Sequence, residues 1–140
     1  MLKLELAQKL ADACLSHAKD AGLKPLTVAV VDASGQLTVL MRQDDTSMMR
    51  ADIAQGKAKG AISMGLGSRA LFERAKSQPY FIQSMNALAG GMLVPVPGGV
   101  LIRQNGDLIG AIGITGDSSD NDETCAIWAI ESLGLVADPG

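Results

Sequence analysis

Aromatic residues make up only 3% of this 140-residue chain, so its core has to be built from aliphatic side chains and methionine. No apolar run approaches the ~20 residues that a membrane-spanning helix needs. Met1 leads directly into an amphipathic, charge-containing stretch, which is unlike a signal peptide. We therefore expect a cytoplasmic protein without a membrane partner.

Basic residues, cysteine and histidine are also scarce. The 12 Lys and Arg residues form no run and the formal net charge is −3, which argues against nucleic acid as a partner. Cys14 and Cys125 are far apart and show no CxxC spacing, so we interpret them as reduced, buried thiols. The one histidine, His17, does not favour a preformed zinc site, which takes three or four ligands.

The chain does contain a series of apolar segments separated by glycine and proline. Its length fits one domain, residues 1–140. The segments with helical periodicity are 2–21, about 46–64, 68–89 with a break at Gln78-Pro79, and about 120–133. The strand-like segments are 26–31, 36–41, 92–96, 100–104 and 107–115. This order, α-β-β-α-α-β-β-β-α with tight hairpins, predicts an α+β domain with a mainly antiparallel sheet.

The most informative segment is 106–128, which predicts a buried strand, a glycine-rich turn and a helix start. Gly110 and Gly113 lie inside the strand, where glycine indicates a close approach by another backbone or a ligand. The run from Asp117 to Asp122 supplies carboxylates and hydroxyls that can cap the N-terminus of the following helix.

Several short motifs, in the right order from residue 2 to about residue 133, match one known family. They are Val31-Asp32 with Gly35, Arg42, Ile53-Ala54 with Lys57-Ala58, Gly98-Gly99-Val100, Asn105-Gly106, the stretch from Gly110 to Gly116, and Asp122-Glu123. On these motifs the chain resembles the GlcG/HbpS family, which includes the C-terminal domain of PduO-type proteins. It departs from the family at Gly99-Val100-Leu101, where Gly-Gly-x-Pro is common, and at Thr115-Gly116, where Ser-Gly is usual.

The resemblance implies a profilin-like fold, in which helices flank a five-stranded, mainly antiparallel sheet. It also implies a homo-oligomer (a dimer, tetramer or octamer) and haem as the cofactor, because several members bind haem and some are linked to iron binding or haem degradation. The matching motifs also indicate four candidate cofactor-binding residues: Gly98, Gly99, Thr115 and Gly116.

His17 is the candidate axial ligand of haem and the candidate metal ligand. At about 100° per residue it falls in the middle of an apolar helical stripe that includes Cys14. A neutral imidazole can bind haem iron, and Cys14, one turn earlier, is a neighbouring or alternative ligand. The other interpretation is a core or interface histidine with one hydrogen bond.

Arg42, Lys57 and Arg103 could neutralise the carboxylates of a ligand, such as haem propionates. Single basic side chains are more often solvated surface charges, and that is the expectation for all three. Lys57 lies at the edge of a helical stripe, a location that allows a site. Gly56 and Gly60, on the same helix, let another backbone approach closely, and we expect tight helix packing there.

No catalytic constellation is visible in the chain. It lacks a Walker loop, a Gly-x-Ser-x-Gly elbow and a dinucleotide fingerprint. The main hypothesis is therefore an oligomeric haem-binding protein, for storage or sensing of haem or iron. One alternative is an accessory protein that binds a small organic ligand without haem, in a hydroxy-acid or diol pathway. Another is an enzyme that depends on a cofactor.

Overall fold

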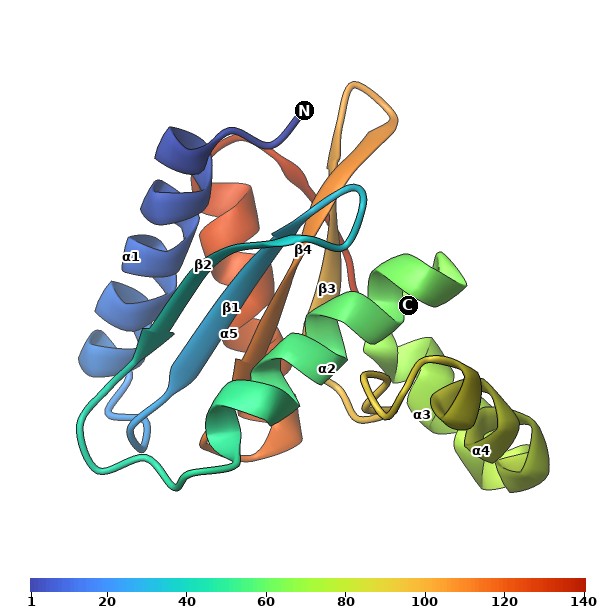
Figure 1. Ribbon diagram of the computed structural model, residues 1–140. Helices are drawn as coiled ribbons and strands as arrows, with labels where there is room; N and C mark the ends of the chain where they lie inside the picture. Colours follow the sequence, from blue (N-terminus) through green and yellow to red (C-terminus); the bar gives the residue numbers. More distant parts are fainter.

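A computed structural model describes all residues, 1–140, as one five-stranded sheet with helices on both faces (Figure 1). The helices are α1 (Leu4–Asp20), α2 (Arg50–Met64), α3 (Ser68–Ser77), α4 (Pro79–Leu88) and α5 (Ser119–Ser132). The strands are β1 (Thr27–Asp32), β2 (Leu37–Arg42), β3 (Gly99–Gln104), β4 (Asp107–Thr115) and β5 (Val136–Asp138). They lie in the order β2-β1-β4-β3-β5, and every neighbouring pair is antiparallel. The predicted α+β fold with a five-stranded antiparallel sheet is confirmed.

The sheet separates two apolar cores of unequal size. α1 and α5 pack against one face and against each other, while α2 packs against the opposite face (Figure 1). The core beneath α1 and α5 contains 20 buried residues, among them Leu10, Val28 and Ile112. The core beneath α2 contains only 5, among them Val31 and Ala111. Successive strand residues point to opposite faces, so β1 and β4 contribute to both cores.

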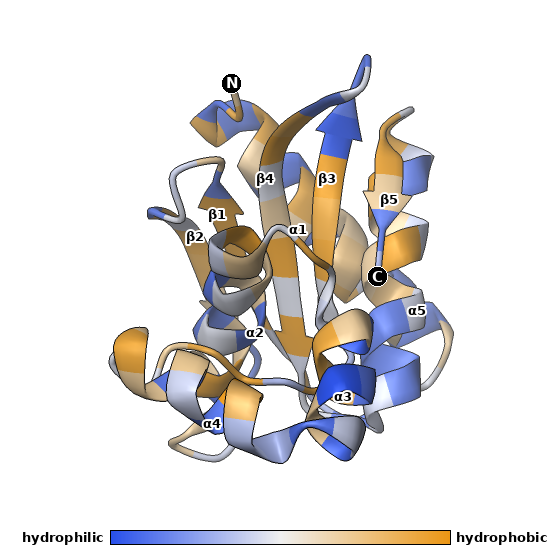
Figure 2. Ribbon diagram, turned by 90° about the vertical axis from the view of Figure 1, so that its right-hand side faces the viewer, coloured by the Kyte–Doolittle hydropathy of each residue, from blue (hydrophilic) through white to orange (hydrophobic).

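Apolar residues are concentrated on the central strands more than on the helices. Figure 2 shows the apolar colour running along β1, β3 and β4, and the polar colour at the tip of the β3–β4 hairpin. The helices are mixed in character because each has one face in solvent. None of them combines the length and the apolar character that crossing a membrane requires.

α3 and α4 form a helical hairpin that projects from the α2 side of the sheet (Figure 1). A small third cluster, Leu71, Ile82 and Leu93, holds it together. Among the regular elements, α4 contacts only α3. Pro79 begins α4, since proline cannot continue the preceding helix but suits the first turn of a new one. The predicted break at Gln78-Pro79 is confirmed.

The prediction of a strand over residues 92–96 is wrong. This segment crosses α2 instead of joining the sheet, and the N–H of Val94 donates to the carbonyl oxygen of Gly56 at 3.1 Å. Pro95 lacks the N–H that a strand ladder needs. The fifth strand is β5, which pairs with β3 at the sheet edge. It is only 3 residues long, too short for a recognisable alternating pattern.

The glycines of α2 make room for the crossing segment. A Cβ on Gly56 would lie 2.5 Å from Cγ2 of Val94, and one on Gly60 would lie 3.0 Å from Cα of Leu93. The close backbone approach predicted for these glycines is confirmed. Its partner, however, is the 92–96 segment, so the expectation of helix packing at this position is wrong.

The hairpin predicted at Asn105-Gly106 joins β3 to β4. Both residues have positive φ, 52° and 85°, which is the combination that a two-residue type I′ turn requires. Further along β4, Gly113 lies against α2, and a Cβ there would overlap the carbonyl oxygen of Ala54. The close approach predicted from the strand glycines is confirmed, and the approaching group is a helix backbone.

Candidate functional site

The predicted site residues fall into two groups on opposite faces of the sheet. His17 and Cys14 belong to α1, on the face shared with α5. Lys57 belongs to α2, on the other face, and lies close to Gly98. Arg42, at the end of β2, belongs to neither group and lines a hollow with Ala18 and Lys19 of α1. The structure therefore does not unite these residues in one site.

His17 lies at the edge of the buried face of α1, so its predicted place in the middle of that face is wrong. The buried residues of the helix are Ala7, Leu10, Ala11, Cys14 and Ala18. The partly exposed imidazole stacks on the indole of Trp128 from α5, with ring centroids 4.5 Å apart and planes inclined by 19°. Trp128 keeps 44% of its surface exposed. The two rings form an aromatic surface at the α1–α5 seam that solvent can reach.

Cys14 and Cys125 lie together inside the core between α1 and α5. Both are free and buried, as predicted, and the thiol of Cys125 donates to the carbonyl oxygen of Cys14 at 3.2 Å. Hydrogen bonding with Cys125, together with burial, raises the pKa of the Cys14 thiol well above its ordinary value. Although Cys14 is one turn from His17, it presents no thiolate at the surface that His17 occupies.

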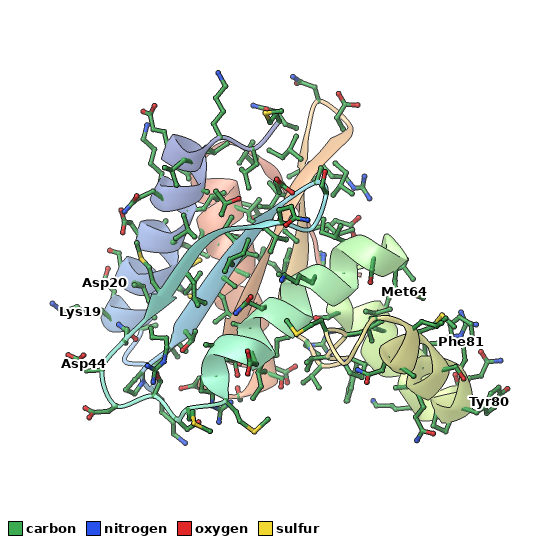
Figure 3. The ribbon with its side chains drawn as sticks, in the orientation of Figure 1. Lys19, Asp20, Asp44, Met64, Tyr80 and Phe81 are labelled. Atoms are coloured by element: carbon green, nitrogen blue, oxygen red, sulfur yellow. The ribbon has the colours of Figure 1, made fainter.

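Arg42 is an exposed charge at one corner of the molecule. Its Nη2 donates to the carbonyl oxygen of Thr46 at 2.9 Å. It lines an open, mostly polar hollow of about 530 Å³ with Lys19 and Asp44, which Figure 3 labels at that corner. Arg103 of β3 is half-buried, and it pairs with Asp138 of the edge strand β5 at 3.1 Å. Arg42 agrees with the expectation of a solvated surface charge, whereas Arg103 is a partly buried charge with an acidic partner.

Lys57 is buried, so the expectation of a solvated charge is wrong for this residue. Its Nζ donates to the carbonyl oxygen of Ile114 at 2.8 Å and lies 3.4 Å from Oδ2 of Asp122. Burial lowers the pKa of Lys57, and the Asp122 carboxylate opposes that shift. Burial likewise raises the pKa of Asp122, with Lys57 acting in the opposite direction. Each charge therefore depends on the other to remain inside the protein.

Gly98 and Gly99 make room for Lys57. Gly98 has φ of 125°, and a Cβ there would lie 2.6 Å from the Ile114 oxygen and 2.9 Å from Nζ of Lys57, the two ends of their hydrogen bond. A Cβ on Gly99 would overlap the backbone carbonyl of Lys57. The N–H of Gly99 also donates to Oγ of Ser68 at 2.7 Å, which ties β3 to α3. These two glycines thus permit the buried lysine to reach its partners.

Thr115 ends β4 with its side chain buried, and its Oγ1 accepts a hydrogen bond from Nη1 of Arg50 at 2.8 Å. Gly116 follows with φ of 139°, and a Cβ there would overlap the carbonyl oxygen of Pro25. Thr27 lies directly opposite Thr115 in the β1–β4 ladder. The buried hydroxyl of Thr27 has no hydrogen-bond partner.

A cavity of about 250 Å³ lies where α2 and α5 both begin, at the lower end of the sheet in Figure 1. Its lining consists of Arg50, Ile53, Lys57, Val94, Val96, Thr115, Asp117, Ser119 and Asp122. Of the predicted residues, it brings together Lys57 and Thr115. The sequence analysis missed Arg50, because it expected the helix to begin at about residue 46, whereas α2 begins at Arg50, where the helix dipole favours acidic side chains.

Acidic and hydroxyl side chains organise the start of α5, as predicted. Oγ of Ser118 accepts from the N–H of Asn121 at 3.1 Å, and Oδ1 of Asp122 accepts from the N–H of Asp117 at 3.1 Å. The N–H of Lys24, the Asn121 amide and the N–H of Ser118 all donate to the Asp117 carboxylate and lower its pKa to about 2. Nowhere in the chain do three or more His, Cys, Asp or Glu side chains gather so that they could hold a metal ion.

The antiparallel sheet, with α1 and α5 on one face and α2 on the other, has the profilin-like α+β fold that the sequence predicted. The family described as "Haem degrading protein HbpS-like" matches residues 2–131. The chain therefore belongs to the HbpS-like family, and the resemblance identified from its motifs is confirmed.

The sequence of this chain is similar to curated proteins that have different names. It is 31% identical over 117 residues to corrinoid adenosyltransferase PduO of Salmonella typhimurium, covering 79% of this chain and 33% of PduO. It is 29% identical over 118 residues to protein GlcG of Escherichia coli, covering 81% of this chain and 83% of GlcG. The chain thus spans about a third of the length of PduO but most of the length of GlcG.

Solved structures show the same fold. The crystal structure of a PduOC:heme complex superposes with a TM-score of 0.85 at 28% identity, covering 96% of both chains. The crystal structure of HbpS gives a TM-score of 0.81 at 29% identity, covering 95% of this chain and 90% of HbpS.

Proposed function

We propose that this protein binds haem, with His17 as the axial ligand, and stores or senses haem or iron. Membership of the HbpS-like family and the similarity to a haem-bound PduOC domain support haem as the ligand. We choose His17 as the haem ligand because of its position in the structure. The chain's single imidazole lies partly exposed against Trp128, and is not sealed in the core.

The residues of the α1–α5 seam fit a haem group in their chemistry. A neutral imidazole is a common axial ligand of haem iron. The indole of Trp128 holds the imidazole plane through stacking and offers apolar surface beside it. The cavity near Lys57 suits haem less well, since its volume of about 250 Å³ lies below the ~300–1,000 Å³ typical of pockets for larger ligands.

Self-association is part of this proposal. Several large apolar side chains are exposed, among them Tyr80 at 67% and Leu88 at 82% on α4 and Leu4 at 60% on α1. Figure 3 shows Tyr80 and Phe81 at the outer end of the α3–α4 hairpin. Exposed apolar surface of this kind marks interfaces in many oligomers. Light scattering at micromolar protein concentration should give the mass of a dimer or a larger assembly, and a monomer would contradict this part of the proposal.

A hemin titration followed by absorbance tests the haem proposal. His17→Phe keeps an aromatic ring for stacking on Trp128 but removes the ligand nitrogen, which makes it a sharper variant than His17→Ala. The matched control is Gln8→Ala, an exposed change on the opposite side of α1. We expect a saturable Soret shift in the wild type and in Gln8→Ala, and loss of that shift in His17→Phe.

Two results would contradict the proposal in different ways. A Soret shift retained by His17→Phe would keep haem but reject His17 as its ligand. No saturable shift in the wild type would reject haem binding, and would favour the alternative of an accessory protein that binds a small organic ligand.

A further inference from the structure

We propose that the cavity between the starts of α2 and α5 binds a small organic carboxylate, held by the guanidinium group of Arg50. This site lies on the α2 face of the sheet, whereas His17 lies on the α1–α5 face. It therefore constitutes a second binding site, and it stands whether or not the protein binds haem.

The guanidinium group of Arg50 uses only one of its N–H donors within the protein. Its one side-chain hydrogen bond goes to Oγ1 of Thr115, and it takes part in none of the ion pairs of the chain. A guanidinium group carries five N–H donors in a planar fork that matches the two oxygens of a carboxylate. An arginine that lines a cavity without an acidic partner is therefore suited to bind an anionic ligand.

The backbone around the cavity favours an anion as well. α2 begins at Arg50 and α5 begins at Ser119, and both of these residues line the cavity. The first N–H groups of a helix give its N-terminus a partial positive charge. A cation at the first position of α2 is unfavourable for the isolated helix. It becomes favourable when an anion lies between the guanidinium group and the two helix ends.

Neither of the two acids in the lining forms an ion pair with Arg50, and both accept hydrogen bonds from other groups. Asp122 accepts from Lys57 and from the N–H of Asp117. Asp117 accepts from two backbone N–H groups and the Asn121 amide. Arg50 is also close enough to Lys57 to disfavour the charged form of the lysine and so lower its pKa further. A bound carboxylate would relieve this repulsion between two cations.

Thr27 is a buried polar residue next to the cavity, although it is not part of the cavity lining. Its hydroxyl is the one buried side-chain polar atom of the chain that lacks a partner. Thr27 faces Thr115 across the β1–β4 ladder, and directly opposed side chains on one face are neighbours.

The size and walls of the cavity define the ligand class. At about 30 Å³ per water molecule, a volume of about 250 Å³ holds on the order of eight waters, which suits an organic acid of a few carbon atoms. Ile53, Val94 and Val96 supply the apolar part of the lining. These walls favour an acid with a short alkyl chain over an inorganic anion, which has no apolar part to bury.

Butyrate and its uncharged counterpart butyramide are the probes for the test. Each is titrated into the ¹⁵N-labelled protein, with and without hemin, while the backbone amide chemical shifts are recorded. We expect butyrate to cause saturable shifts for residues 50–57 and 115–119, with a millimolar dissociation constant, and butyramide to cause none. Arg50→Gln should weaken butyrate binding about ten- to a hundredfold, because it removes a charge-assisted hydrogen-bonding pair.

Two further variants separate binding from folding. Arg42→Gln removes an exposed guanidinium outside the cavity and should bind butyrate as the wild type does. Val96→Phe fills the cavity without changing a polar group and should also abolish the shifts. The proposal is overturned if butyrate gives no saturable shift in the wild type, or if Arg50→Gln binds it unchanged. Equal shifts from butyramide or from inorganic phosphate would overturn the choice of an organic carboxylate.

Discussion

Lys57 and Asp122 form an ion pair inside the protein, with Nζ and Oδ2 3.4 Å apart and only 3% and 1% of the two side chains exposed. The pair links the middle of α2 to the first turn of α5 past the end of β4. The carbonyl oxygen of Ile114 and the N–H of Asp117 complete the hydrogen bonding of the two charges. Removing one partner would leave the other charge buried and uncompensated.

Lys57→Met should therefore destabilise the fold by about 3–5 kcal/mol, the usual cost of breaking a buried pair from one side. Combining it with Asp122→Asn removes the stranded charge while keeping an acceptor for the N–H of Asp117. We expect the double variant to recover at least about 1 kcal/mol relative to Lys57→Met, since contacting residues couple by that order. Urea unfolding measures both values, and a single variant as stable as the wild type would contradict the buried pair.

Asp117 should make stability depend on acid pH. Its pKa is lowered from 3.8 to about 2, first of all by the N–H of Lys24, so the folded state binds a proton less readily than the unfolded state. The stabilisation is present above pH 3.8 and is lost as the pH falls toward about 2. Thermal unfolding across this window should show a flatter decline for Asp117→Asn than for the wild type. Parallel declines would show that the carboxylate contributes no such linkage.

Ser118 should stabilise α5 as its N-cap, because its Oγ accepts from the N–H of Asn121. Ser118→Ala is expected to lower the free energy of unfolding by about 1 kcal/mol. Ser119→Ala, a change at the next position, provides the matched control, as the Ser119 hydroxyl makes no capping bond. Chemical denaturation should separate the two variants, and equal stabilities would argue against the cap.

Substitution of Gly113 should lower the stability of the fold more than substitution of a turn glycine does. A Cβ at this position would overlap the Ala54 carbonyl oxygen of α2, so Gly113→Ala should cost about 1–3 kcal/mol through overpacking. Gly106→Asn is the comparison, since Gly106 has nothing within 4 Å of its Cβ position and asparagine tolerates positive φ. We expect a clearly smaller loss of melting temperature for Gly106→Asn. The reverse order would mean that α2 can move away from β4.

The two cysteines should react slowly with a thiol reagent such as dithionitrobenzoate in the native protein and rapidly in urea. Both thiols are buried, which restricts the access of the reagent. Hydrogen bonding with Cys125, together with burial, raises the pKa of Cys14, whereas hydrogen bonding with Cys14 lowers the pKa of Cys125, so burial is the reason for the slow reaction of Cys125. His17→Phe should leave the native rate unchanged, because His17 lies outside the thiol cluster. Rapid reaction of one thiol without denaturant would show that α1 and α5 separate readily.

The sequence predicted those parts of the fold that are encoded locally. The Asn105-Gly106 turn and the Gln78-Pro79 break depend on the backbone preferences of single residues, and both are confirmed. The 92–96 segment was mistaken for a strand because its apolar residues pack against α2. Periodicity alone cannot show which neighbour an apolar run has. β5 was missed because three residues carry too little pattern.

The candidate site was harder to predict because tertiary contacts determine it. The burial of Lys57 depends on Asp122, 65 positions away in the sequence, and on the space that Gly98 leaves. Helical periodicity put His17 in the middle of an apolar stripe, but the packing of α1 buries a neighbouring set of residues and leaves His17 at the edge, against Trp128. Arg50 could be recognised as a candidate ligand-binding residue only from the structure, which shows that its one side-chain hydrogen bond goes to Thr115.

Among the regular elements α4 contacts only α3, and the 92–96 segment, which crosses α2, is its other contact with the rest of the molecule. The small cluster of Leu71, Ile82 and Leu93 holds the α3–α4 hairpin together. Neither the aromatic seam of α1 and α5 nor the cavity beside Arg50 takes a residue from α4. The outer surface of this helix, where Tyr80 and Leu88 are exposed, can therefore change in composition and acquire new contacts, while its inner residues continue to hold the 92–96 segment.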